Sequence, residues 1–427
     1  MDDANKKLHI DAKTMIKSII KENLPDEAVK TALKGRSFDS GVYVVSIGKA
    51  AWTMADAAAN VLADKLIKGI VITKYGHSMG AIPKMDIYEA GHPIIDENSL
   101  TATNKVIELA QELGEGDELL FLLSGGGSAL FEAPVEGVTL EDLQRLSADL
   151  LSVGCDIVEI NMIRKRLSKV KAGRFAQIAA PAKIFVVVLS DVLGDRLDTI
   201  SSGPAAPDAS TVSECLETVK KYGISLNEIQ KAHLTKETPK TLDNAETTVV
   251  GSVRSFCNSA AVSAASLGYT PYILTTMLNC EAKEAGRFLA ATAKDIDAGT
   301  SHFKRPCAVI CGGETVVHLK GSGKGGRNQE LALSAAEGLA GLKNAVLFSL
   351  GSDGTDGPTD AAGGIVDCNT KNALKNAGFT VHGLLAENDA YTGLSAVDGL
   401  IITGPTGTNV NDVAVLLMGN TILQPIQ

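Results

Sequence analysis

Along the chain, short apolar runs alternate with longer stretches in which apolar residues recur every three or four positions. The first pattern is typical of buried strands and the second of amphipathic helices. Residues 41–66 are predicted to form a strand, a glycine turn and an alanine-rich helix. Strands that alternate with helices predict a mostly parallel sheet with helices on both faces, so the predicted fold class is α/β.

A helix with a well-marked start is predicted after Thr139. Thr139 and Asp142 have the spacing of a capping box, in which each side chain bonds the other residue's backbone N–H group. The leucines that follow form one apolar stripe, which ends before Gly154: Leu140, Leu143, Leu146, Leu150. This spacing predicts an amphipathic helix that packs on one face.

The chain of 427 residues is too long for one hydrophobic core. Its apolar periodicity fades between about residues 223 and 246, where polar residues dominate, and resumes afterwards. We therefore expect two α/β domains, residues 1–243 and residues 244–427.

The charge, the apolar content and the cysteines of the chain argue against nucleic-acid binding, membrane insertion and secretion. The formal net charge of −10 argues against a nucleic-acid partner, because nucleic-acid binders carry basic surfaces. No apolar run approaches the roughly 20 residues that span a bilayer, and the first residues lack the apolar segment of a signal peptide. The seven scattered cysteines include no C-x-x-C pair and fit reduced thiols. We expect a cytoplasmic protein with no membrane partner.

Polar residues follow almost every predicted strand. Ligands of parallel α/β sheets bind beyond the carboxyl ends of the strands, so this repetition indicates a site, although chance clustering is an alternative. The positions are Gly48-Lys49, Ser124 to Ser128, Ser190-Asp191, Gly312-Gly313-Glu314, Gly351-Ser352-Asp353 and residues 403–412.

Three consecutive glycines interrupt the stretch "FLLSGGGSALFEAP". Ser124, Gly125, Gly126, Gly127 and Ser128 follow a predicted strand and precede a predicted helical turn. Such a turn aims several backbone N–H groups at one point and can bind phosphate or carboxylate. A tight turn packed under a helix is the alternative. The stretch matches neither the Walker A pattern nor G-x-G-x-x-G.

Two cations stand where a glycine turn enters a predicted helix, Lys49 in "SIGKAAW" and Arg327 in "GGRNQELAL". A cation at a helix start opposes the helix dipole at a cost of about 0.3–1 kcal/mol. Both helices could simply tolerate a surface cation. Alternatively, an anion is bound there by the N–H groups together with the cation.

Carboxylates complete the candidate set. Asp191 follows a predicted buried strand, and "GSDGTDGPTDAAGG" offers Asp353, Asp356 and Asp360. Their spacing differs from an EF-hand loop, but Mg²⁺ needs only one or two carboxylates plus phosphate oxygens. Asp-Gly pairs are also common turn formers, which accounts for Asp356 and Asp360 better than for Asp353.

The most basic stretch is "RKRLSKVKAGR", residues 164–174. Its apolar spacing favours an amphipathic helix with a solvated cationic face; the functional alternative is that it borders an anion site. His77 and His92 are lone histidines near predicted loops, and we interpret them as structural.

Anion-binding loops, cations and free carboxylates are the groups that phosphoryl transfer requires, because that chemistry depends on positioning and charge stabilisation. A triad hydrolase fits poorly, since no G-x-S-x-G elbow occurs. The residues alone therefore indicate a phosphate-handling α/β enzyme with two domains.

At these motifs the sequence resembles the class II glycerate kinases, the glycerate 2-kinase family whose C-terminal part is called the MOFRL domain. Ala172 is one departure, because the family's pattern predicts a glycine pair there. The matching stretches run from about residue 41 to 412 and are "SIGKAAW", "EAGHPIIDENS", "LLSGGGSAL", "IRKRLSKVKAGR", "LSDVLGD", "SSGPAAPD", "CGGETVV", "GGRNQELAL", "GSDGTDGPTDAAGGIVD" and "TGTNVND".

The resemblance implies ATP-dependent phosphorylation of D-glycerate at its 2-hydroxyl, with Mg²⁺ or another divalent metal. It also implies a Rossmann-like N-terminal domain and a smaller C-terminal α/β domain around a cleft. Carried over by position, Lys49, Asp191 and Arg327 are the expected catalytic groups, and Asp353 and Asp191 the expected metal ligands. The expected substrate and phosphate contacts are Ser124, Gly125, Gly126, Gly127, Ser128, Glu314, Asn328, Asn409 and Asp412.

Two rival functions stay open at this point. One is a nicotinamide-dependent hydroxypyruvate reductase, which the absent dinucleotide fingerprint disfavours. The other is a non-catalytic sensor of nucleotides or sugar acids. The sequence leaves open whether the protein forms a homodimer.

Overall fold

The computed structural model describes residues 3–420, which form two compact units. The middle unit comprises residues 25–250. The terminal unit combines residues 3–24 with residues 251–420. The sequence predicted one division after residue 243; the chain instead passes between the units twice, after Leu24 and after Val250.

The first helix, α1 (Asp3–Glu22), belongs to the terminal unit because its partners lie there. The Tyr269 hydroxyl donates a hydrogen bond to Asp11 at 2.6 Å, and the Asn23 amide, just beyond α1, donates to Ser259 at 3.0 Å. A division based on local pattern cannot assign a helix whose partners lie more than 200 residues away.

The middle unit is built on a six-stranded sheet with the order β3-β2-β1-β4-β5-β6. Neighbouring strands from β3 to β5 run parallel, as the alternation of strands and helices predicted. The order reverses between β1 and β4, where ligands of such sheets bind. The strands are β1 (Val42–Ile47), β2 (Leu66–Lys74), β3 (Met85–Ala90), β4 (Glu118–Leu123), β5 (Lys183–Leu189) and β6 (Ala245–Gly251).

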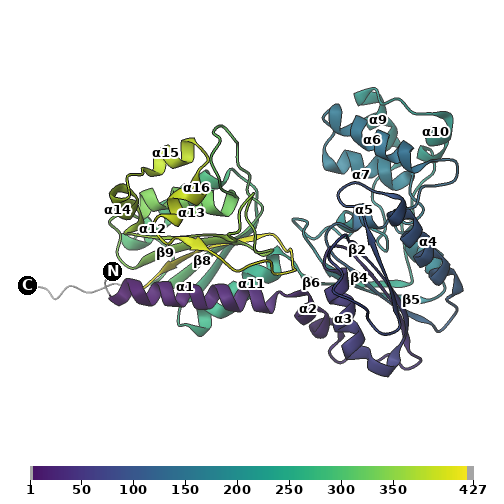
Figure 1. Cartoon of the computed structure of the whole chain (residues 1–427), viewed down its shortest axis with the longest axis horizontal. Coiled ribbons are helices and arrows are strands. Elements are labelled where there is room, and N and C mark those ends of the chain that lie inside the picture. Colours follow the sequence, from purple (N-terminus) through teal and green to yellow (C-terminus); the bar gives the residue numbers. More distant parts are fainter. Residues whose placement is uncertain (1–2, 421–427) are drawn as a thin grey trace, which may run out of the picture. The chain divides into compact units, whose positions relative to one another are not determined.

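Four helices of the middle unit, α6, α7, α9 and α10, form a small cluster with its own apolar core (Figure 1). Helix α6 confirms the predicted capping box of Thr139 and Asp142 and buries all four leucines of the stripe. The helices are α2 (Pro25–Leu33), α3 (Ala51–Leu62), α4 (Glu97–Glu112), α5 (Gly127–Leu130), α6 (Leu140–Ser152), α7 (Ile157–Arg166), α8 (Arg174–Ala179), α9 (Val212–Tyr222) and α10 (Glu228–Leu234), with 3₁₀ turns η1 (Ala63–Lys65) and η2 (Ile200–Ser202).

The terminal unit has a mixed sheet with the order β11-β10-β9-β12-β8-β7. Only β7 and β8 pair in parallel, so the expected parallel arrangement does not extend to this unit. The strands are β7 (Thr270–Leu278), β8 (Cys307–Gly313), β9 (Ala345–Gly351), β10 (Gly363–Asp367), β11 (Leu400–Ile401) and β12 (Asp412–Met418). Antiparallel pairing places the first residue of β12, Asp412, opposite Gly313 and Gly351, the last residues of β8 and β9.

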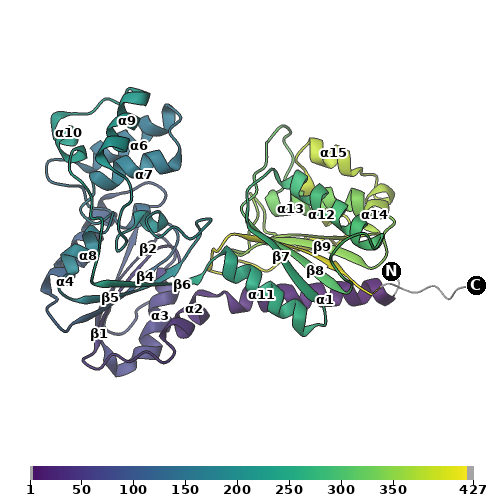
Figure 2. The same cartoon turned by 180° about the vertical axis from the view of Figure 1, so that it is seen from behind.

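Helices cover both faces of this sheet (Figures 1 and 2). Helices α1 and α11 lie on one face, and α12 and α13 lie on the other with α14 to α16. Their bounds are α11 (Val253–Ser266), α12 (Ala282–Asp297), α13 (Arg327–Leu339), α14 (Thr370–Asn376), α15 (Val381–Ala386) and α16 (Ala390–Ser395). Within residues 3–420, no helix is long and apolar enough to cross a membrane.

Candidate active site

In the middle unit, three predicted site segments meet where the strand order reverses. The Lys49 N–H, beyond β1, donates to the Gly125 carbonyl at 2.9 Å, and the Ala50 N–H donates to Ser124 Oγ at 3.1 Å. Residues 124–128, the glycine loop, follow β4, and Asp191 follows β5. The parallel sheet therefore brings Lys49, the glycine loop and Asp191 together.

The glycine loop is crowded by side chains of the protein itself. A Cβ atom on Gly125 would lie 2.2 Å from Asp191 Oδ2, and one on Gly127 would lie 2.2 Å from Ser201 Oγ. Gly126 has φ +90°, which glycine adopts readily. Contacts with side chains of the protein and the backbone angle of Gly126 therefore account for the three glycines without a ligand. The anion-binding role stays a prediction.

His92 was interpreted as structural, yet it lies beside the loop. A Cβ atom on Gly126 would lie 3.0 Å from His92 Cδ2 and 3.2 Å from Lys49 Cγ. Burial, and then the charge of Lys49, lowers the pKa of His92, which favours the neutral ring. His77 lies close as well, with its Nδ1 at 3.1 Å from the Lys49 carbonyl oxygen. The only sequence signal for His92 was its place in a stretch that matched the family.

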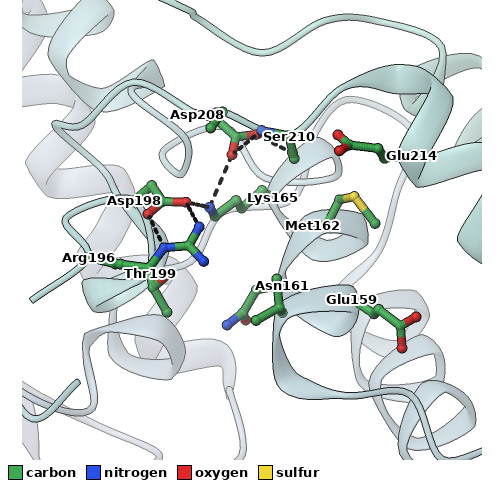
Figure 3. Close-up of a pocket in the computed structure, with 12 residues that line it drawn as sticks. Glu159, Asn161, Met162, Lys165, Arg196, Asp198, Thr199, Asp208, Ser210 and Glu214 are labelled. Atoms are coloured by element: carbon green, nitrogen blue, oxygen red, sulfur yellow. Dashed lines mark hydrogen bonds and ion pairs between the residues drawn. The ribbon is translucent and has the colours of Figure 1, made fainter. Parts of the chain in front are cut away.

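The basic stretch is not a solvated face. Lys165, Arg166 and Lys171 are buried, so that interpretation is wrong for these three residues. Figure 3 shows the Lys165 ammonium between Asp198 and Asp208. The ammonium lies 3.6 Å from the Asp198 carboxylate and 3.2 Å from the Asp208 carboxylate, and the three residues line a cavity of about 280 Å³. Buried charges need partners, and the neighbouring carboxylates provide them.

In the terminal unit, two carboxylates hold Arg327, the first residue of α13. Its Nε donates to Asp412 Oδ2 at 2.6 Å, and a terminal nitrogen donates to Glu314 Oε1 at 2.8 Å. We call these three residues the arginine cluster. They come from the start of α13, the start of β12 and the end of β8. Carboxylates of the protein therefore already balance this cation at a helix start.

The amides of the same helix start bind another carboxylate. The N–H groups of Asn328 and Gln329 donate to the two oxygens of Asp356, at 3.1 and 2.8 Å. Burial raises the pKa of Asp356 to about 7 and that of Asp412 to about 6. Asn328 is itself buried and accepts a hydrogen bond from Ser349 at 2.6 Å. Asn328 and Asp356 thus have structural partners within the unit.

Asp353 lies beside the arginine cluster. A Cβ atom on Gly351 would lie 3.3 Å from both Asp353 Oδ1 and Asp412 Oδ1. Asp353 Oδ1 also accepts the Thr355 N–H at 3.0 Å. Asn409 lies on the loop before β12, which is tied to the Asp353 loop by the 2.7 Å bond from the Val410 N–H to Ser352 Oγ.

No group of three or more His, Cys, Asp or Glu residues that could hold a metal occurs within residues 3–420. The two predicted metal ligands lie in different units, Asp191 in the middle unit and Asp353 in the terminal unit. Carboxylate oxygens are the donors that Mg²⁺ prefers, and Mg²⁺ keeps several waters or phosphate oxygens in its shell. The donor chemistry of each carboxylate therefore fits a magnesium–nucleotide complex, and the metal-binding role of both residues stays a prediction.

Family descriptions match most of the chain. A domain of unknown function (DUF4147) matches residues 11–235, and the MOFRL family matches residues 307–412. A D-glycerate 2-kinase from Thermotoga maritima is 52% identical over 97% of this chain and 98% of its own length. The crystal structure of a Thermotoga maritima glycerate kinase matches with a TM-score of 0.94 and 52% identity, covering 97% of this chain and 100% of that one.

A putative hydroxypyruvate reductase from Agrobacterium vitis is 38% identical over 88% of this chain and 87% of its own length. The α/β fold together with the kinase relatives defines an enzyme of the phosphotransferase class. The chain belongs to the glycerate 2-kinase family with a C-terminal MOFRL domain.

Proposed function

We propose that this protein transfers the γ-phosphoryl group of ATP to the 2-hydroxyl of D-glycerate, giving 2-phosphoglycerate. The observation that carries the proposal is the 52% identity to a D-glycerate 2-kinase along nearly the full length of both chains. A kinase activity implies ATP as the phosphate donor. A cytoplasmic location and the absence of nucleic-acid partners stay predictions.

The glycine loop and Lys49 are suited to hold the transferring phosphoryl group. Its transition state spreads negative charge over three oxygens, and catalysis consists mainly of positioning and charge stabilisation. We propose that the Lys49 ammonium stabilises this negative charge. Asp191, which lies against Gly125, is a carboxylate that can accept the proton of the 2-hydroxyl.

Arg327 supplies the second cation. Asp412 and Glu314 fix the plane of its guanidinium, and such preorganised charge needs no rearrangement during the reaction. Lys49 belongs to the middle unit and Arg327 to the terminal unit, and both stay predicted catalytic groups.

A divalent cation bound with ATP would neutralise charge on the nucleotide phosphates. Asp191 and Asp353 are the residues that we expect to hold it. Asn409, Glu314 and Asp412 stay as predicted substrate or phosphate contacts, although Asp412 and Glu314 already bind Arg327.

The test is to incubate the purified protein with ATP, Mg²⁺ and D-glycerate and to identify the product by ³¹P NMR. We expect 2-phosphoglycerate and stoichiometric ADP, with L-glycerate as the stereochemical control. Formation of 3-phosphoglycerate, or no ADP release above the rate without glycerate, would contradict the proposal.

One observation favours a second candidate: the relative from Agrobacterium vitis is called a putative hydroxypyruvate reductase. The glycine loop lacks the G-x-G-x-x-G pattern of dinucleotide sites, which disfavours it. Oxidation of NADH by hydroxypyruvate without ATP would establish the reductase instead.

A further inference from the structure

A buried ion pair between Lys171 and Glu132 is attached to the backbone of the glycine loop. The Lys171 side chain is fully buried, and Glu132 is 1% exposed. The Lys171 ammonium donates to Glu132 Oε2 and, at 2.7 Å, to the main-chain carbonyl of Ser128. Ser128 is the last residue of the loop, so this charge bonds directly to its backbone.

This pair is poorly explained by stability alone. Removing two charges from water is costly, and apolar residues of similar volume often stabilise a protein as well or better. Within the described part of the chain, Glu132 Oε1 has no hydrogen-bond partner although it is buried. An incompletely satisfied buried group calls for an explanation other than stability.

The turns that support the loop are strained. Ala172, where the family pattern predicted glycine, has φ +55°, and Ser201 and Ser202 have φ +50° and +62°. The Ala172 N–H donates to the Ser202 carbonyl at 3.0 Å, and Ser128 Oγ lies 2.9 Å from Ser202 Oγ. Non-glycine residues keep such conformations only where their surroundings enforce them. Lys171 precedes Ala172 in the chain and bonds the Ser128 carbonyl, so it connects the strained turn to the glycine loop.

We propose that Lys171 is a positioning residue for the phosphoryl transfer. With Glu132 as its counter-ion, it holds the Ser128 end of the glycine loop, so that the loop keeps its register with Lys49, His92 and Asp191. The proposal rests on the proposed kinase function, and it assigns no contact with substrate to Lys171.

The decisive comparison is between Lys171→Met and the double variant Lys171→Met/Glu132→Gln. The single variant leaves a buried carboxylate without a partner, so we expect a large loss of thermal stability. The double variant removes both charges and should recover most of that stability. If Lys171 positions the loop, kcat/KM of the double variant stays at least tenfold below that of the wild type. Recovery of kcat/KM together with stability would overturn the proposal.

Hydrogen exchange gives a readout that needs no substrate. We expect the amides of residues 125–128 to exchange faster in the double variant than in the wild type at matched global stability. Unchanged exchange would contradict the positioning role. Turnover of glycerate by the wild type tests the proposed function separately.

A second buried pair in the middle unit, Lys165 and Asp208, provides the matched control. Within residues 3–420, neither side chain of this pair forms a hydrogen bond with a residue of the glycine loop. Lys165→Met/Asp208→Asn should change stability by a similar amount, while kcat/KM of the folded enzyme stays within about twofold. A tenfold loss in this control would mean that any buried charge in the unit affects turnover.

The wild type offers a further measurement if the variants do not fold. Burial lowers the pKa of Lys171 to about 8, with Glu132 and Arg164 as the charged groups that act on it. We expect turnover to fall above about pH 8. Between pH 8 and 10.5 the unfolded chain binds more protons at this residue, so its contribution to the unfolding free energy rises with pH. Deprotonation of Lys171 therefore does not destabilise the fold, so unfolding caused by this residue cannot explain a loss of turnover. Turnover that stays level through pH 9 would contradict the proposal.

Discussion

The glycine loop and the arginine cluster differ in what balances the positive charge at a helix start. Each has a cation where a glycine turn enters a helix. In the middle unit, Lys49 lies beside Gly126 and beside His92, whose pKa is lowered by burial and by the charge of Lys49. In the terminal unit, two carboxylates already hold Arg327, and a third occupies the amides of the helix start. The difference shows that a cation at a helix start can have an anion of the protein as its partner, so it does not by itself indicate a ligand.

The comparison assigns different tasks to the two cations. Among the ion pairs of residues 3–420 none joins Lys49 to a carboxylate, so its ammonium can follow the charge of a moving phosphoryl group. An arginine held by two carboxylates keeps its guanidinium in one plane. Substitutions at the two sites should therefore change the kinetic constants to different extents.

The largest effect is expected for Arg327→Lys. Lysine keeps the charge but cannot bond Asp412 and Glu314 through a planar fork. We expect a loss in kcat on the order of 10³, the lower end for arginines that stabilise phosphoryl transfer, with nucleotide affinity largely kept. Steady-state kinetics and calorimetry check this. Arg287→Lys, at an exposed pair with Glu284, is the control and should have full activity. A fully active Arg327→Lys enzyme would exclude the assigned role.

Lys49→Ala should lower kcat by about 10² and raise KM much less, because the ammonium acts on charge that develops in the transition state. Lys68→Ala, an exposed lysine on β2, is the control. An unchanged kcat with a raised KM would make Lys49 an anchor for the ground state instead.

Gly125→Ala tests the crowding of the glycine loop. The added methyl group would lie 2.2 Å from Asp191 Oδ2, so it must displace that carboxylate. We expect kcat to fall about tenfold while the melting temperature changes little. Gly114→Ala, where the nearest atom is 3.8 Å away, controls for the loss of glycine freedom. Wild-type kinetics in Gly125→Ala would show that the position of Asp191 is not critical.

The smallest effect concerns Asp412. Burial raises the pKa of Asp412 to about 6, so the charge of the carboxylate, and with it the ion pair with Arg327, is lost as the pH falls through 6. We expect kcat to fall several-fold below pH 6, and Asp412→Asn to lower kcat several-fold and remove that dependence. Between pH 3.8 and 6 the folded state binds more protons here, so the contribution of Asp412 to the unfolding free energy decreases as pH rises.

A pH–rate profile and a pH series of unfolding curves check the two opposite trends. Asp360→Asn, at an exposed carboxylate that accepts a hydrogen bond from Tyr391, is the control. An acid limb that survives in Asp412→Asn must come from another group.

Local features of the fold could be predicted from the sequence because they depend on neighbours in the chain. The capping box of Thr139 and Asp142 joins residues three apart, and the leucine stripe follows from the helical period. The alternation of strands and helices correctly predicted the parallel sheet of the middle unit. It also placed Lys49, the glycine loop and Asp191 on one edge, because the carboxyl ends of parallel strands meet there.

Three features depend on tertiary contacts that the sequence does not reveal: the strand directions of the terminal unit, the assignment of α1 and the partners of the charged residues. Arg327 meets Asp412 from 85 positions away, and Lys171 meets Glu132 from 39. A residue's type indicates that it needs a partner when buried, but not which partner the path of the chain will supply. The basic stretch was therefore visible in the sequence, whereas its burial was not. Burial depends on the packing of α7, the turns at 171–173 and 201–203 and the glycine loop, which lie far apart in the chain.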